Sequence, residues 1–153
     1  MRNLPLTVFE EYLFHENRSD YPCNIFVRTR FSGNLQRNRF AQAVQKVAHL
    51  HPHLTATIER GLFGRLHWKF NGSAKIPIHW LQEGIDSYKP DFGSFNPEKE
   101  ISFQLFVAHE PNRWDLYVNQ SHSLCDGAGY FRFLHDLLTV SYTHLTLPTN
   151  REV

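Results

Sequence analysis

The spacing of two alternating segments constrains the fold of this chain more than any other feature of its sequence. Apolar and polar residues alternate over Ile101–His109 and again over Trp114–Gln120, which is typical of strands with one face in a core. Between them lies Glu110–Arg113, whose Pro-Asn pair is typical of a turn. So short a connection joins antiparallel neighbours, whereas a parallel crossover needs about a dozen residues or more, so we predict a β-hairpin.

Helical and strand patterns alternate along the rest of the chain. The expected helices are 7–16, with a capping box from Thr7 and Glu10 and a stripe of Val8, Phe9, Tyr12, Leu13 and His15; 35–50, ended by Pro52, with a face of Leu35, Phe40, Val44, Val47 and Ala48; and 126 onward, with Phe131, Leu134, Leu137 and Leu138 facing inward. The other expected strands are Ile25–Phe31, Leu54–Glu59, Leu66–Phe70 and Ile76–Leu81. This order, with its hairpins, predicts an α+β fold in which helices flank a mixed sheet.

The composition excludes several classes of protein. The formal net charge is +1, so nothing in the charge balance indicates binding to nucleic acid or to a membrane surface. No run of about 18 apolar residues and no signal pattern occurs, which predicts a cytoplasmic protein without a membrane span. Cys23 and Cys125 lack CxxC spacing, so we expect two buried thiols rather than a disulfide. Thirteen Phe, six Tyr and three Trp would suit an apolar tunnel.

We expect the end of the chain, residues 140–153, to be foreign to the protein. Its sequence, VSYTHLTLPTNREV, is what results from translating DNA that looks like the transposon end and adaptor of short-read sequencing libraries. Such a segment carries no information about the native fold, and we expect His144 to belong to no functional site. The authentic sequence is then predicted to stop near Thr139, within an apolar helix.

One segment, Asn119–Gly127, combines residues that can carry chemistry. It follows an apolar strand and precedes a helix, so His122 falls at or just after a strand end, where a scaffold presents side chains rigidly. Histidine titrates near neutral pH and can take a proton from a hydroxyl, an amine or a thiol. Asp126 is placed to cap the next helix, and Gly127 permits close backbone approach. A histidine at an ordinary Asp-Gly turn is the alternative.

Ser121-His122-Ser123-Leu124-Cys125-Asp126-Gly127 resembles the HHxxxDG motif of peptide-synthetase condensation domains and the HxxxDG motif of related alcohol and polyketide acyltransferases. These share the chloramphenicol-acetyltransferase-like fold, and residues 4–139 are similar to the order of its N-terminal half. The resemblance implies that His122 is the catalytic base, that Asp126 holds the loop through an ionic contact, and that Gly127 keeps the channel open. Ser121 stands where condensation domains have their first histidine, which favours the HxxxDG transferases.

The resemblance also implies the reaction and its partners. Residues 1–139 would be an incomplete N-terminal lobe, and a missing C-terminal lobe would supply the other wall of the tunnel. An acyl group would pass from acyl-CoA or an acyl carrier protein, as a thioester co-substrate, to a small-molecule alcohol or amine. No bound cofactor and no metal are implied, and the truncated chain is expected to be inactive alone.

Three alternatives to this interpretation differ in how well the sequence supports them. A Ser121, His122 and Asp126 triad is rejected because adjacent residues on a strand point to opposite faces. A metal site from His49, His51 and His53, or from His122 with Cys125, lacks the ligand spacing of zinc modules. A catalytically inactive condensation-like binding or docking module, or a fragment without function, stays open.

Overall fold

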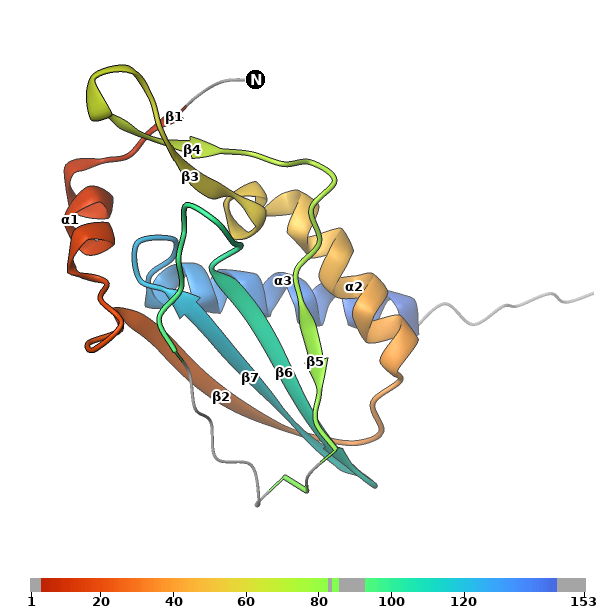
Figure 1. Ribbon diagram of the computed structural model, residues 1–153. Helices are drawn as coiled ribbons and strands as arrows, with labels where there is room; N and C mark the ends of the chain where they lie inside the picture. Colours follow the sequence, from red (N-terminus) through yellow and green to blue (C-terminus); the bar gives the residue numbers. More distant parts are fainter. Residues whose placement is uncertain (1–3, 83, 86–92, 146–153) are drawn as a thin grey trace, which may run out of the picture.

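A computed structural model describes residues 4–82, 84–85 and 93–145 of the chain (Figure 1). The helices are α1 (Val8–Glu16), α2 (Arg37–Leu50) and α3 (Gly127–Leu145). The strands are β1 (Leu4–Pro5), β2 (Asn24–Ser32), β3 (Thr57–Arg60), β4 (Leu66–Lys69), β5 (Ile78–Trp80), β6 (Phe103–Glu110) and β7 (Arg113–Ser121). One sheet has the order β2-β7-β6-β5 and a smaller antiparallel sheet the order β1-β4-β3, which confirms the α+β prediction.

The predicted hairpin forms the centre of the larger sheet. Strands β6 and β7 pair antiparallel from Phe103 opposite Gln120 to Glu110 opposite Arg113. At the turn, Asn112 has a positive φ of 65°, a conformation that asparagine tolerates better than most residues. Strand β2 pairs antiparallel with the other side of β7, and β5 pairs parallel with β6, so the sheet is mixed as predicted. Because β7 is a central strand, its end at Ser121 is held on both sides.

Helices α2 and α3 cover one face of this sheet and enclose the main core. The large buried side chains of this core include, from α2, α3, β6 and β7, those of Phe40, Val44, Val47, Tyr130, Phe133, Leu137, Phe103, Leu105, Val107, Leu116 and Val118. Each large apolar side chain buried in this way contributes about 1.5–3 kcal/mol. The apolar face predicted for 35–50 is therefore confirmed, although α2 begins at Arg37, two residues later.

The first helix forms as predicted, but most of its apolar stripe is exposed. The capping box is present, with the Glu10 N–H donating to Thr7 Oγ1 and the Thr7 N–H donating to Glu10 Oε2. Of the predicted stripe only Leu13 is buried, while Val8, Phe9 and Tyr12 are 87%, 63% and 57% exposed. Helix α1 lies at the edge of the molecule (Figure 1), and Leu13 is its one buried side chain.

The inward face predicted for the last helix is also partly wrong. Phe131 and Leu138 are exposed, whereas Tyr130 and Phe133 are buried together with Leu137. The buried stripe thus has the spacing i, i+3 and i+7, which is an ordinary helical face turned by one residue from the predicted one. The apolar sequence here supplies more than one face, so its periodicity alone did not decide which face meets the sheet.

Segment boundaries differ from the prediction at several places, for example in β5, which spans Ile78–Trp80 where Ile76–Leu81 was expected. The strand expected at Leu54–Glu59 begins with a 3-10 turn over Pro52–Thr55, for which proline at its first position is well suited, and β3 follows. Helix α3 passes Thr139 and continues through Leu145, while 146–153 lie outside the described residues. The foreign tail stays a prediction. None of the helices within the described residues has the length and apolar content to cross a membrane.

Candidate functional site

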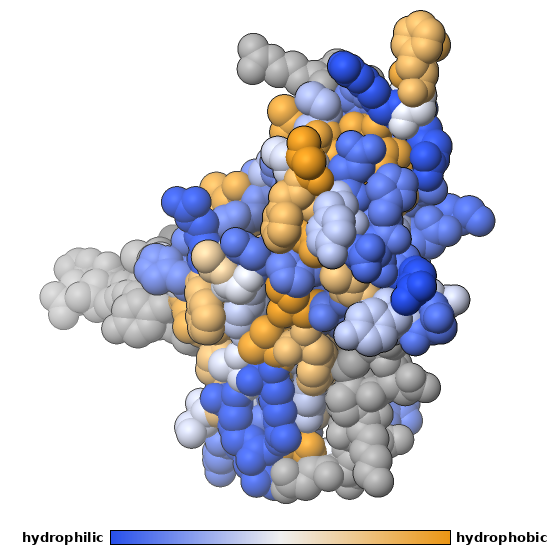
Figure 2. Space-filling view, turned by 90° about the vertical axis from the view of Figure 1, so that its left-hand side faces the viewer, coloured by the Kyte–Doolittle hydropathy of each residue, from blue (hydrophilic) through white to orange (hydrophobic). Residues whose placement is uncertain are grey.

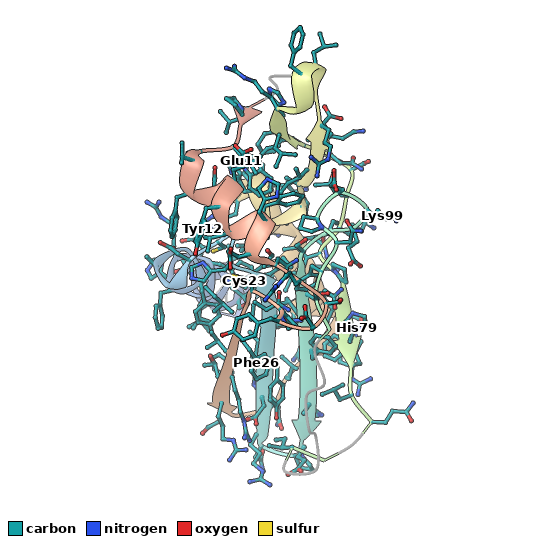
Figure 3. All side chains as sticks on the ribbon, turned by 60° about the vertical axis from the view of Figure 1, so that its left-hand side comes forward. Glu11, Tyr12, Cys23, Phe26, His79 and Lys99 are labelled. Atoms are coloured by element: carbon teal, nitrogen blue, oxygen red, sulfur yellow. The ribbon has the colours of Figure 1, made fainter. Side chains whose placement is uncertain are left out.

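His122 is anchored to the end of the central strand. Strand β7 ends at Ser121, and the next backbone N–H, that of His122, donates to the Cys23 carbonyl at 2.9 Å. Cys23 directly precedes β2, beside which this end of β7 lies, and is labelled in Figure 3. The Leu124 N–H donates back to the Ser121 carbonyl at 3.1 Å and closes the turn toward α3. The backbone at His122 is therefore fixed by hydrogen bonds on both sides, as a presented functional side chain requires.

A cleft of about 520 Å³ opens beside this loop. Its walls come from α1, from 50–54 at the end of α2 and in the turn after it, and from 122–126 with the first turns of α3. Pockets for small ligands have volumes of roughly 300–1,000 Å³ and are mostly apolar with a few polar groups. The cleft has such a lining, with Phe9, Leu13, Leu54 and Leu124 beside His122. It can therefore accommodate a small molecule.

The ring of His122 has an unmatched polar atom. Its Nδ1 is buried and has no hydrogen-bond partner among the residues that the structure describes. Leaving a buried polar group without a partner costs about 1–3 kcal/mol, so such atoms are rare and call for an explanation. No carboxylate of the described chain orients this imidazole.

Ser121, His122 and Asp126 do not form a relay. The hydroxyl of Ser121 lies 2.9 Å from that of Ser123, and both side chains are buried. Asp126 is exposed, and its Oδ1 accepts the N–H of Gly129 at 2.7 Å. Neither partner of the rejected triad therefore reaches His122.

Asp126 caps helix α3 through this hydrogen bond, in the position that the sequence predicted for it. The ionic contact that the resemblance implies for Asp126 has no counterpart within the described ranges 4–82, 84–85 and 93–145. What the structure shows for this carboxylate is a cap on the helix that follows His122.

The two glycines of this segment differ in what surrounds them. A β-carbon at Gly127 would meet nothing within 4 Å, and its φ is not in the left-handed region. A β-carbon at Gly129 would collide with the sulfur of Cys125. Gly129, for which the sequence predicted no role, is thus the glycine of this segment at which a side chain would force Cys125 to move. The Gly-Ala-Gly run at the start of the helix is the signal that could have indicated it.

The two cysteines are free thiols, as expected, but both are only partly buried. Burial, and then the charge of Asp126, raise the pKa of the Cys125 thiol to about 11, although a hydrogen bond with Gln120 opposes the shift. Burial, and then Glu16, raise the pKa of Cys23 as well. Since the thiolate is the nucleophile and the metal ligand, neither sulfur is activated at neutral pH.

The three histidines at the end of α2 point to different surroundings. His49 is exposed, His51 Nε2 lies 2.7 Å from Asp136 Oδ2, and His53 packs edge-on against Trp68 and Phe70. Among the described residues, no three histidine, cysteine or acidic side chains are grouped as metal ligands. His53 lines the cleft together with His122, a role that the sequence analysis did not predict because it depends on contacts with β4 and α1.

No protein-family model and no curated protein matches the chain. Several solved structures, by contrast, are similar to it in fold. An X-domain from teicoplanin biosynthesis, in complex with OxyB, superimposes with a TM-score of 0.79 at 14% identity, over 100% of this chain and 35% of that one. The starter condensation domain of rhizomide synthetase gives 0.77 at 16%, over 100% and 40%, and the condensation domain of the monacolin K polyketide synthase gives 0.77 at 12%, over 100% and 36%.

These likenesses confirm the expected fold. At 12–16% identity they concern the fold alone, which is that of condensation domains. The chain spans well under half the length of each of these solved chains. That coverage fits the N-terminal half of such a domain.

Proposed function

We propose that this chain forms the N-terminal lobe of an acyltransferase that moves an acyl group from a CoA or carrier-protein thioester to an alcohol or an amine. The observation that carries the proposal is the placement of His122, fixed at the end of a central strand and lining a ligand-sized cleft. The condensation-domain fold supports the same conclusion.

In the proposed reaction His122 is the general base. Its imidazole takes the proton from the acceptor O–H or N–H while the acceptor atom attacks the thioester carbonyl. The C–S bond then breaks, and the leaving thiolate takes the proton back from the imidazolium. An ester or amide and a free thiol result, without a covalent enzyme intermediate. Holding acceptor and thioester in one cleft supplies the proximity on which such a transfer depends.

Two neighbours support His122 in this proposal. Asp126 caps α3 and so fixes the loop at its far end. Gly127, where a β-carbon would meet nothing within 4 Å, is the residue that would keep the channel open. Both roles are structural, and neither residue handles the proton.

We further propose that 1–139 belong to a longer protein and that 140–153 are not native to it. The solved chains with this fold extend well beyond the part that the chain covers. A long sequencing read through the source DNA past the codon of Thr139 tests this proposal. We expect the reading frame to continue with the second lobe, and a genomic match to VSYTHLTLPTNREV followed by a stop would contradict it.

The reaction is tested by acyl transfer from acetyl-CoA to a panel of alcohols and amines, followed as release of the CoA thiol. The protein encoded by the longer reading frame is used in this assay, and the 153-residue chain is assayed in parallel. His122→Ala is expected to abolish transfer while the fold is retained. His135→Ala is the matched control, because this histidine of α3 has a side chain that is 77% exposed and does not line the cleft. Unchanged turnover in His122→Ala would reject the general base.

A docking module without catalysis is the second candidate. One of the similar solved structures is an X-domain in complex with another protein, OxyB. In the present chain, apolar side chains gather on the side that carries α1 (Figure 2), including the exposed Val8, Phe9 and Tyr12. Two results together would favour this candidate. The longer protein would show no acyl transfer, and it would bind a partner protein that a Phe9→Ser variant no longer binds.

A further inference from the structure

His53 lines the same cleft as His122, although the two residues are far apart in the sequence. It lies in the 3-10 turn that follows α2, and is half-buried. Its ring packs edge-on against Trp68, at a centroid distance of 5.7 Å, and against Phe70, at 4.9 Å, with an interplanar angle of 84° in each case. Two aromatic rings at right angles to the imidazole restrict its rotation, so the side chain is oriented before any ligand arrives.

The surroundings of His53 favour its neutral imidazole, which has no hydrogen-bond partner among the described residues. Burial lowers its pKa from the ordinary value, although the carboxylate of Glu10 opposes this shift. A neutral imidazole offers one N–H donor and one acceptor nitrogen. Within the part of the chain that the structure describes, no hydrogen bond to this ring is formed, whereas the neighbouring His51 is paired with Asp136.

The other polar groups of the cleft wall are already engaged. Thr7 and Glu10 bind each other's backbone in the capping box, the Ser123 hydroxyl pairs with Ser121, and Asp126 caps α3. Arg132 also contributes to the wall but is exposed. His51 lines the cleft as well, but its Nε2 is paired with Asp136 Oδ2 at 2.7 Å. The remaining lining is largely apolar, so His53 and His122 are the two imidazoles of this wall that have no side-chain partner among the described residues.

We propose that His53 is a specificity-determining residue of this cleft, where its ring hydrogen-bonds a polar group of the acceptor other than the hydroxyl or amine at His122. The inference rests on the proposed function for the identity of the ligand as an acyl acceptor. It assigns the acceptor to a class, an apolar molecule with a second hydrogen-bonding group, such as a diol or an amino alcohol. An acceptor without that group would leave the half-buried imidazole without a partner and bind more weakly.

Binding to the 153-residue chain tests this inference without requiring any transfer. The probes are 1-hexanol and three diols of the same chain length, 1,2-, 1,5- and 1,6-hexanediol, titrated while the histidine ring signals are followed by NMR. We expect at least one diol to bind about fivefold or more tightly than hexanol, the gain typical of one added hydrogen bond. The signals of His53 and His122 should shift with the same dissociation constant.

Variants identify the ring that is responsible. His53→Phe should remove the diol preference and retain hexanol binding, and His53→Gln, which keeps a donor and an acceptor, should retain part of it. His49→Phe is the matched control, because this exposed histidine does not line the cleft. A wild-type chain without diol preference, or an unchanged preference in a folded His53→Phe chain, would overturn the inference. Failure of acyl transfer with the diol preference intact would reject the proposed function alone.

Discussion

A β-carbon on Gly129 would collide with the sulfur of Cys125, whereas a β-carbon on Gly127 would meet nothing within 4 Å. Cys125 and Asp126, at the end of the loop that carries His122, lie directly against Gly129 in the first turn of α3. The glycine of the Asp-Gly pair therefore leaves open space, and the next glycine in the chain allows the loop to pack.

Replacing these two glycines by alanine separates the two roles. Gly129→Ala should lower the free energy of unfolding by about 1–3 kcal/mol, the usual cost of overpacking, because the Cys125 side chain has to move. Gly127→Ala should be neutral or stabilising by up to about 1 kcal/mol, since alanine is the better helix former. Urea denaturation of both variants measures the difference. Equal stabilities would show that the loop can shift away from α3 without cost.

The cap at Asp126 predicts a second difference. Asp126→Ala removes the acceptor of the Gly129 N–H and should lower the free energy of unfolding by about 0.5–2 kcal/mol. Asp126→Asn keeps a capping oxygen and should recover most of that loss, because asparagine and aspartate cap almost equally well. Thermal unfolding of both variants makes the comparison. A fully stable Asp126→Ala chain would contradict the capping role.

Local patterns in the sequence predicted what depends on local geometry. The hairpin of β6 and β7, the capping box of α1, the apolar face of α2 and the position of His122 after a strand all follow from residues close together in the chain. A period of two or of 3.6 residues and the turn residues between the segments are sufficient for such features.

Features that depend on distant contacts could not be predicted in the same way. A helical stripe shows that one face is apolar, but not which neighbour covers it, and so Phe131 and Leu138 of α3 were expected to face inward although both are exposed. His53 becomes part of the cleft through Trp68 and Phe70, which lie more than a dozen residues away. These contacts arise only when the two sheets and the helices have packed together.

The other face of the large sheet carries a buried ion cluster that makes stability depend on pH. Asp115 is fully buried, and its oxygens accept hydrogen bonds from Arg28 Nε at 2.6 Å and Arg30 Nε at 2.8 Å. Burial by itself raises the pKa of this carboxyl, but the hydrogen bonds and charges of Arg30 and Arg28 outweigh burial and leave the pKa below its usual value. The stabilisation is therefore complete above the unfolded-state pKa and lost as the pH falls through the folded-state pKa.

Asp115→Asn should accordingly lose about 1.5–3 kcal/mol at pH 7, the range for hydrogen bonds to a charged group, and should lose less stability between pH 5 and pH 3 than the wild type. Urea denaturation at several pH values measures both effects. Asp20→Asn is the control, because Asp20 is 77% exposed and its contact with Arg18 is 3.8 Å long. The same acid dependence in Asp115→Asn as in the wild type would show that other carboxylates cause it.

The Cys125 thiol lies beside the candidate base, so its reactivity decides whether a thiolate could serve as nucleophile in this cleft. With a pKa of about 11, only about one thiol in a thousand is ionised at pH 8, compared with roughly a quarter for an unperturbed cysteine. In a Cys23→Ser chain, iodoacetamide should therefore react with Cys125 on the order of a hundredfold more slowly in the folded state than in urea, because the thiolate is the reacting form. Cys125→Ser should also keep the acyl transfer proposed for His122. Rapid alkylation of the folded chain at pH 8, or loss of transfer in a stable Cys125→Ser variant, would favour a thiolate mechanism and leave the histidine to activate the sulfur instead of the acceptor.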